Sequence, residues 1–503
     1  MYKHNSKQLE FEDFALPFSG GLRSDNRWIK IAKFIPWDEF ELFYSKSLSG
    51  SQMGSPALSV RIAIGSLIIK ERLGTSDEET VEQIRENPYL QYFLGFKEYK
   101  DEAPFHPTMF VYFRKRIGKK TLAKINEIIT KKALSQAMKA SEEKPPDDKN
   151  DGPGLSVSKN KGKLLVDATC TPADITFPTD LKILNTAREK SEEVIDILHR
   201  PLRGNQKKPR TYRKKARKEF LSVAKSKKLS KSKRRKAIRK QLGYLRRNLK
   251  TIEKQSEHTS LTILTGKQYK NLLVIHEVFR QQRWMFDHRE NRIADRIVSI
   301  SQPHVRPIKR GKARATEFGA KISASLVDGF AFVDRISWDN YNEAGDLKEQ
   351  IESYHNRFGF YPESVHADKI YRNRDNRKFC KKLGIRLSGP ALGRPPKQID
   401  SQREIQARQD ELDRIPIEGK FGQAKRRFSL SKIMCKLAQT SETAIAVTFI
   451  VLNIERWLKA ILFCLFFRLE SEFSIEFWLP YVVSKQLVTP NGCIFQKPES
   501  AMS

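Results

Sequence analysis

Two stretches of sequence decide the fold: Lys163-Leu-Leu-Val-Asp167 and Val365-His-Ala-Asp368. In each, a short apolar run typical of a buried β-strand ends at an aspartate, whose side chain can project beyond the sheet edge into a cleft. A third acid, Glu418, lies in Arg414-Ile-Pro-Ile-Glu-Gly-Lys-Phe-Gly-Gln-Ala-Lys425, where we expect it just inside the start of a helix. Because seven residues on a helix return to nearly the same face, Glu418 and Lys425 are expected to look into one site.

The segments around these stretches predict a mixed sheet. A helix capped by Thr179 or Asp180 should follow the first strand, and residues 317–338 have the pattern of a β-hairpin that turns at Val327-Asp328-Gly329. A further helix should lead to the strand ending at Asp368; its apolar residues are Leu347, Ile351, Tyr354 and Phe358. The resulting order of strand, insertion, hairpin, helix, strand and helix predicts an α+β domain, compatible with a ribonuclease H-like core and formed by residues 163–199 and 259–465.

Positive charge is concentrated in the insertion predicted at residues 200–258. The chain of 503 residues carries a formal charge of +35, and residues 200–250 hold 23 Lys or Arg against the single acid Glu219. The second half of this block has apolar residues at alternating steps of four and three, which predicts an amphipathic helix: Ile238, Leu242, Leu245, Leu249 and Ile252. A solvated helix face is the alternative, but so one-sided a charge favours phosphate contacts, and nucleic acid is a better partner than acidic lipid. The candidate DNA-binding residues here are Lys231, Lys233, Arg234, Arg235, Lys236 and Arg239.

The remaining chain divides into three parts. Residues 1–137 should form a helical N-terminal domain, with a capping box at Ser76-Asp-Glu-Glu79 and a break at Leu73-Gly74-Thr75 that suits a helix-turn-helix. This domain either binds DNA or simply docks on the core. Residues 138–162 are rich in Pro, Gly and charge and predict a linker, while residues 466–503 form a C-terminal extension of unknown role.

The cysteines and the apolar segments bear on the cellular compartment. Five cysteines, far apart and without a C-x-x-C pair, argue against a zinc module and a disulfide framework and favour a reducing compartment. The polar N-terminus has no apolar signal core. The apolar run 444–467 contains Glu455, Arg456 and Lys459, which favours a buried C-terminal helix pair over a membrane span. We therefore expect a cytoplasmic protein without membrane contact.

Three carboxylates on separate elements suit metal-dependent phosphodiester chemistry. Such chemistry needs anionic oxygens that converge on two ions about 3.5–4 Å apart, and hard oxygen ligands favour Mg²⁺, for which Mn²⁺ can substitute. Each acid also has a simpler explanation, because Asp can cap a turn and Glu in a first helical turn complements the helix dipole. Asp174 and Asp180 compete with Asp167 for the first position. His366 shares a strand face with Asp368 and is either a ligand, a proton shuttle or a packing residue, and Lys369 and Arg372 contact either phosphate or solvent.

Several separated segments resemble bacterial insertion-sequence DDE transposases, in particular the division with a Tyr-(2)-Arg-(3)-Glu-(6)-Lys signature. The likeness covers about residues 25–460 and rests on these segments: Ile68-Ile-Lys-Glu-Arg-Leu-Gly74, Glu86-Asn-Pro-Tyr-Leu-Gln-Tyr-Phe93, Asp167-Ala-Thr-Cys-Thr-Pro-Ala-Asp174, Pro178-Thr-Asp-Leu-Lys-Ile-Leu-Asn185, His366-Ala-Asp-Lys-Ile-Tyr371 and Arg414-(3)-Glu418-(6)-Lys425. The resemblance implies a ribonuclease H-like domain in which Asp167, Asp368 and Glu418 bind metal and catalyse, while Arg414 and Lys425 contact DNA. One departure is Glu411 at the Tyr position, which puts an aromatic contact to the DNA end in doubt.

The expected function is therefore a transposase that binds the two ends of its mobile element, cuts them and joins them to target DNA. Its partners would be double-stranded DNA and, since an element has two ends, a second copy of itself on paired ends; its place would be the bacterial nucleoid. A nuclease that cuts without joining is one alternative. A DNA-binding protein without catalytic activity is the other.

Overall fold

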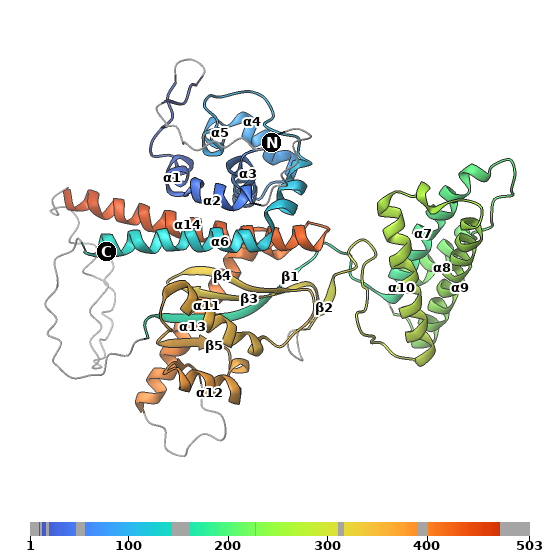
Figure 1. The fold of residues 1–503 in the computed structure, drawn as a ribbon. Coiled ribbons are helices and arrows are strands. Elements are labelled where there is room, and N and C mark those ends of the chain that lie inside the picture. The colour runs from blue at the N-terminus through green and yellow to red at the C-terminus, as the bar shows by residue number, and fades with distance from the viewer. Residues whose placement is uncertain are drawn as a thin grey trace, which may run out of the picture. The chain divides into compact units, whose positions relative to one another are not determined.

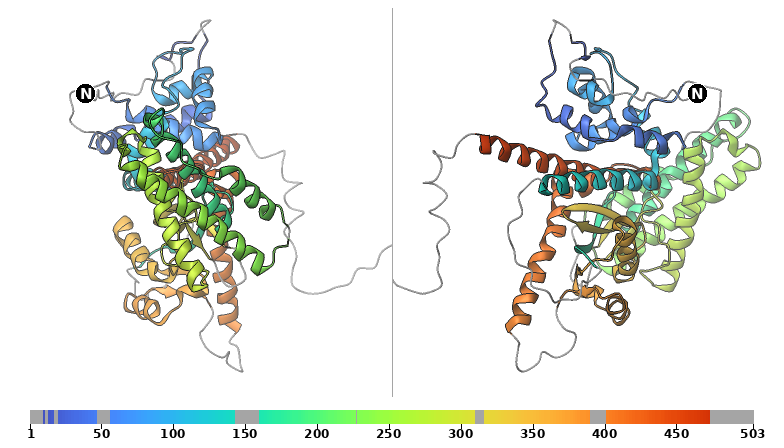
Figure 2. Two further views of the ribbon diagram at one scale, coloured as in Figure 1. Left: turned by 90° about the vertical axis from the view of Figure 1, so that its right-hand side faces the viewer. Right: turned by 60° about the vertical axis from the view of Figure 1, so that its left-hand side comes forward.

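A computed structural model describes residues 10, 13–16, 20–46, 56–142, 160–226, 228–309, 316–389 and 401–472. Figure 1 shows the elements, and Figure 2 shows the same ribbon from two further sides. The chain forms two compact units, Met1–Ile454 and Glu455–Ser503.

The N-terminal part is helical, as the sequence predicted. Its helices are α1 Arg27–Phe34, α2 Trp37–Ser45, α3 Val60–Leu73, α4 Asp77–Glu86, α5 Pro88–Leu94 and α6 Met109–Glu142. Helix α3 ends at Gly74, whose φ of 70° is readily adopted only by glycine, and α4 begins after Ser76, whose side chain accepts a hydrogen bond from the Glu79 amide. Helix α6 has non-helical backbone at Gly118 and continues to Glu142, into the segment predicted as a linker.

The described residues contain a six-stranded mixed sheet. Its strands are β1 Lys163–Pro172, β2 Arg306–Ile308, β3 Glu317–Val327, β4 Phe330–Ser337, β5 Ser364–Ala367 and β6 Arg386–Leu387. The order is β2-β3-β1-β5-β6, with β4 also paired to β3; β1, β5 and β6 run parallel, whereas β3 is antiparallel to β1. The predicted hairpin is confirmed, because β3 and β4 are joined by Asp328 and Gly329, both with positive φ.

Helices pack around this sheet. They are α11 Leu347–Phe358, α12 Arg374–Lys382, α13 Ser401–Arg427 and α14 Ala438–Glu472, and a short 3-10 helix, η6 Lys369–Tyr371, follows β5. Asn126 of α6 and Asn453 of α14 both donate to the Ala331 carbonyl of β4, which fixes these two helices beside the hairpin (Figure 1). An α+β architecture with a mixed sheet is therefore confirmed.

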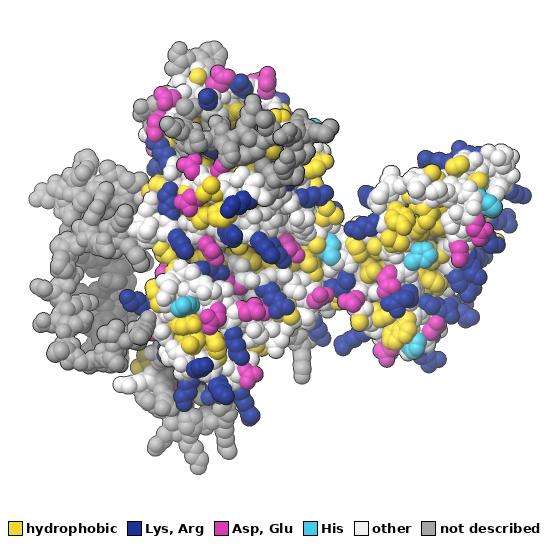
Figure 3. Space-filling view, in the orientation of Figure 1, with side chains coloured by type: hydrophobic (Ala, Val, Ile, Leu, Met, Phe, Trp, Pro, Cys, Tyr) yellow, Lys and Arg dark blue, Asp and Glu magenta, His cyan; other side chains and the backbone are white. Residues whose placement is uncertain are grey.

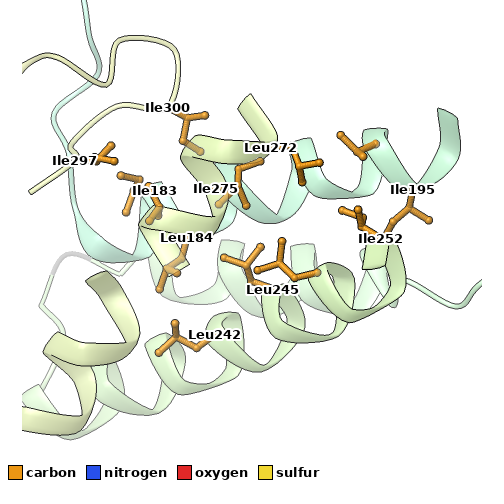
Figure 4. Packing of buried hydrophobic residues seen from close by; sticks show 14 of the residues in the cluster. Ile183, Leu184, Ile195, Leu242, Leu245, Ile252, Leu272, Ile275, Ile297 and Ile300 are labelled. Carbon is orange, nitrogen blue, oxygen red and sulfur yellow. The ribbon is translucent and has the colours of Figure 1, made fainter. Parts of the chain in front are cut away.

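The insertion predicted at residues 200–258 forms part of a four-helix bundle with its own core. Its helices are α7 Asp180–Leu198, capped by Thr179, α8 Arg213–Ala224, α9 Lys231–Ser256 and α10 Gly266–His288. The predicted seam is confirmed, since Leu242, Leu245, Leu249 and Ile252 are buried and Ile238 packs beside them. Figure 4 shows this core, which also includes residues of α7 and α10. The bundle thus includes α7 and α10, which lie outside the predicted range 200–258 and within the ranges predicted for the catalytic domain.

Two expectations near the C-terminus are wrong. Glu418 is not in a first helical turn, because α13 begins at Ser401 and continues through Pro416. The C-terminal apolar run forms one helix, α14, and not a helix pair. Among the described residues, no helix has the length and apolarity needed to cross a membrane.

Candidate functional site

Strand register brings Asp167 and Asp368 side by side. Strands β1 and β5 pair in parallel from Lys163 with Ser364 to Val166 with Ala367, so the two aspartates occupy the next position on each chain. Neighbouring strands lie about 4.8 Å apart, and residues in register point to the same face. The backbone at Asp368 is still extended, with φ −65° and ψ 157°. The pairing therefore directs both carboxylates to one face at the end of the parallel ladder.

The prediction that Asp167 ends its strand is wrong. Strand β1 continues to Pro172 because β3 pairs with it along this whole length, including Asp167 opposite Ala324. Only the β5 side of β1 stops at Val166, so Asp167 lies where one neighbour has ended and the other continues. The oxygens of both aspartates are oriented locally: Asp167 Oδ1 accepts from the Ala168 amide at 2.8 Å, and Asp368 Oδ1 accepts from the Lys369 amide at 2.6 Å.

Helix α13 carries Glu418 beside the same strands. The helix contacts β1 and β5, and its buried residues Ile417, Phe421 and Ala424 anchor it. The Glu418 side chain is 51% exposed, and its Oε1 forms an ion pair with Arg414 Nη1 at 2.7 Å. Among the described residues, the three predicted carboxylates do not form a group whose ligand atoms all lie within 4.8 Å of one another. The register thus gives the two aspartates neighbouring strand positions, and Glu418 pairs with Arg414 one turn earlier on the same helix, α13.

His366 is a fully buried connection between β5 and α13. Its Nε2 lies 3.0 Å from Ser364 Oγ and 3.8 Å from Asp413 Oδ2. Its Nδ1 lies 3.7 Å from Asp410 Oδ1 and has no hydrogen-bond partner within the described part of the chain. Burial lowers the pKa of His366, although the charges of both aspartates oppose this effect. The structure therefore favours a neutral packing role for His366, next to the strand end that carries Asp368.

The acids around His366 are themselves paired. Asp410 accepts two hydrogen bonds from Arg386 Nη1, at 2.8 and 2.9 Å, and Asp413 accepts one from Lys163 Nζ at 2.7 Å. Although burial opposes it, the hydrogen bond from Lys163 helps to lower the pKa of Asp413. The group His366, Asp410 and Asp413 has the donor types of a divalent-metal site, with ligand atoms within 4.8 Å of one another. The sequence had not pointed to either aspartate, because only the packing of α13 on β5 brings them to His366.

Tyr371 is a second residue that the sequence did not single out. It lies in η6, is fully buried, and its hydroxyl has no hydrogen-bond partner among the described residues. Burial raises the pKa of Tyr371, and the negative charge of Asp167 adds to this effect. Its hydroxyl is therefore a neutral polar group held within electrostatic range of Asp167. The sequence shows it only as the last residue of the segment His366–Tyr371.

The two competing acids and Arg372 have partners elsewhere. Asp174 accepts hydrogen bonds from Lys432 and Lys436, which lower its pKa to about 2, and Asp180 bonds to Gln282 and Arg296. Neither is placed beside Asp368 by the strand register. Arg372 donates to the carbonyl oxygens of residues 387–389, which accounts for it structurally, while Lys369 is exposed and its phosphate contact stays a prediction.

The basic residues predicted to bind DNA lie at the start of α9. Lys231, Lys233, Arg234, Arg235, Lys236 and Arg239 are all exposed. Arg235 is engaged internally, with its guanidinium 4.1 Å from the centre of the Phe286 ring and a hydrogen bond to the Phe286 carbonyl. Lys and Arg side chains gather along the edge of the α7–α10 bundle in Figure 3. No acid occupies the first turn of α9, so these cations add to the positive end of the helix dipole, an arrangement that costs stability unless an anion binds.

Two family models and one curated protein are similar to parts of this chain. Residues 365–455 match the family described as transposase DDE domain, and residues 18–116 match the family described as transposase domain (DUF772). An uncharacterized protein, ORF8 in the nfe locus of Rhizobium meliloti, is 30% identical over 155 residues. That region covers 31% of this chain and 66% of the relative. No solved structure matches significantly. The two family matches support a similarity to insertion-sequence transposases in these two regions of the chain.

Proposed function

We propose that this protein is a DDE transposase that binds the ends of an insertion sequence, cleaves the DNA there and transfers the ends to target DNA. The main support for this proposal is the register of β1 and β5, which gives Asp167 and Asp368 neighbouring strand positions next to the helix that bears Glu418. The match to a transposase DDE domain begins at Val365 and includes both Asp368 and Glu418. Cleavage and strand transfer are both in-line displacements at phosphorus, so one site can serve both.

Asp167, Asp368 and Glu418 are the residues proposed to hold Mg²⁺ or Mn²⁺. They fit such ions because they offer only carboxylate oxygens, two of them from adjacent strand positions. When bound, the ions would activate the attacking oxygen and stabilise the leaving oxygen. The chain's own contribution is to hold the three carboxylates in place. Arg414 pairs with Glu418 until another ligand of Glu418 replaces it. His366, Asp410 and Asp413 are less suited, since Arg386 and Lys163 already neutralise the two acids.

DNA is the proposed substrate along two surfaces. Lys425 lies two turns after Glu418 on α13, where it can contact the backbone near the cut, and Arg414 can do so once released from Glu418. The exposed cations of α9 would bind phosphates farther away. Glu411, at the signature's Tyr position, is exposed on the same helix and would repel phosphate there.

The finer features of the resemblance belong to this proposal as well. They are a ribonuclease H-like classification of the mixed sheet, a homodimer on paired ends, and a cytoplasmic, nucleoid-associated location. The family matches favour a transposase over a protein that only binds DNA.

A cleavage and strand-transfer assay tests the proposal. The substrate is duplex DNA carrying the inverted repeats that flank the coding region, with Mg²⁺ or Mn²⁺, and the native chain is compared with Asp167→Asn, Asp368→Asn and Glu418→Gln. We expect joined product from the native chain and none from the three variants, all of which should still bind the DNA. Cut but unjoined product would indicate a nuclease. Binding without chemistry in the native chain would indicate a DNA-binding protein.

A further inference from the structure

A basic groove lies at the C-terminal end of α13, two turns beyond Glu418. Its volume is about 320 Å³, and its walls come from α3 and the turn after it, from α6, from the end of α13, from the segment that follows and from α14. The charged side chains in its lining are Lys70, Glu71, Arg114, Lys425, Arg426 and Arg427. The groove therefore joins the N-terminal helical domain to the helix that carries the predicted catalytic glutamate.

A buried carboxylate holds the two sides of this groove together. Glu71 of α3 accepts hydrogen bonds from the Ser429 amide at 3.0 Å, from Ser429 Oγ at 2.8 Å and from Thr448 Oγ1 at 2.5 Å. Ser429 comes two residues after the end of α13, and Thr448 lies on α14. With these partners, Glu71 fixes the end of α3 beside the end of α13, and the groove is a built feature of the fold.

The groove has a net positive charge. On the N-terminal side, Asp77 is shared by Lys70 at 3.1 Å and Arg114 at 2.5 Å, so these three groups leave one positive charge. The end of α13 adds Lys425, Arg426 and Arg427, and Glu71 removes one charge. With five cations and one acid, the lining of this concave site favours a polyanion over a neutral or cationic ligand.

Helix geometry gives the distance from the groove to the predicted site of cleavage. Glu418 and Lys425 are seven residues apart, which is about 10 Å along a helix axis. One DNA strand advances about 3.4 Å per nucleotide along the duplex axis. For a duplex whose axis runs parallel to α13, the groove would lie at the level of a phosphate about three nucleotides from the cut.

We infer that this groove binds the DNA backbone about three nucleotides from the scissile phosphate and holds one strand between the α3–α4 turn and the end of α13. The inference rests on the proposed function, because it takes Glu418 as the place of cleavage. It adds a phosphate site formed jointly with Arg426 and Arg427, which lie outside the signature. It also means that DNA held by the N-terminal domain is positioned by direct contact with the helix of Glu418.

A phosphate-neutralisation scan tests this inference. The probe is a duplex carrying the terminal inverted repeat, in which single phosphates on either strand are replaced by neutral methylphosphonates, and affinity is measured for the native chain and for Arg426→Gln/Arg427→Gln. Both arginines are exposed, so the variant should keep its melting temperature. The control is Arg408→Gln, an exposed arginine on α13 about five turns away.

For the native chain and the control, we expect neutralisation about three nucleotides from the cut to weaken binding about two- to fivefold. In the double variant the same replacement should have no further effect, because the contact is already gone. Equal losses in the native chain and the double variant would overturn the groove while leaving the proposed function intact. No binding of terminal DNA by the native chain would overturn both.

Discussion

The cations at the start of α9 allow a quantitative prediction. Lys231, Lys233, Arg234 and Lys236 are exposed, and none of them has an ion-pair partner within the described part of the chain. Arg235 is left unchanged because it stacks on Phe286. We expect replacement of the four residues by Gln to weaken the binding of any duplex DNA, whatever its sequence, because phosphate contacts carry no base information.

The magnitude follows from counterion release. Each phosphate neutralised on duplex DNA contributes about 0.9 to the slope of log affinity against log salt concentration. If each of the four side chains contacts one phosphate, the variant's slope should be shallower by about 3.6. Between 50 and 200 mM salt, the native chain should therefore lose about 150-fold more affinity than the variant.

Fluorescence anisotropy with a labelled duplex, measured across this salt range, checks the prediction. The control is Arg280→Gln/Arg283→Gln on α10 of the same bundle, since these arginines already pair with Glu277 at 2.6 Å and Asp287 at 2.7 Å. The control should keep the native slope. The four-residue variant should be no less stable than the native chain, because it removes cations from the positive end of a helix dipole. An unchanged salt slope in the folded variant would refute the phosphate role of α9.

Four further outcomes are expected. Asp368→Asn should abolish cleavage and joining yet change the free energy of unfolding by less than about 0.5 kcal/mol, because the side chain is exposed; equal loss of folding in urea would contradict this. His366→Ala should lower the free energy of unfolding by about 2–4 kcal/mol, since it leaves a cavity beside two paired acids, and a loss below about 1 kcal/mol would speak against the connection. Leu245→Ala, in the bundle core, should lower the free energy of unfolding by about 3 kcal/mol, as followed by circular dichroism. It should weaken DNA binding only near the melting temperature. For Asp77, burial raises the pKa, but the hydrogen bond and charge of Arg114 lower it below 3.8, so the ion pair stabilises the fold fully above pH 3.8 and less as the pH falls further. Asp77→Asn should therefore flatten the pH dependence of the free energy of unfolding below about pH 4. The same pH dependence in the variant and the native chain would exclude this ion pair as the source of acid sensitivity.

The turns, helix starts and buried helix faces could be predicted from the sequence because they depend on residues close together in the chain. The Asp328-Gly329 turn predicts the hairpin because its residues readily adopt positive φ, and the spacing from Leu242 to Ile252 predicts one buried helix face. Thr179 predicts the start of α7 because its side chain bonds to an amide three residues later. These signals operate within a few residues, so no tertiary contact is needed to recognise them.

The site itself needed the tertiary structure wherever its contacts join distant segments. The sequence named Asp167 and Asp368 as strand-associated acids, but only the β1–β5 register makes them neighbours, and only β3 extends β1 past Asp167. Glu418 was expected just inside the start of a helix, whereas α13 begins 17 residues earlier, at Ser401, and is continuous through Pro416, with its buried residues packed beside β1 and β5. The burial of Tyr371 and the groove closed by Glu71 likewise depend on long-range contacts. Sequence thus determined the residue types and their local geometry, while the tertiary structure decided which side chains meet, because register and helix packing are set by burial of surfaces far apart along the chain.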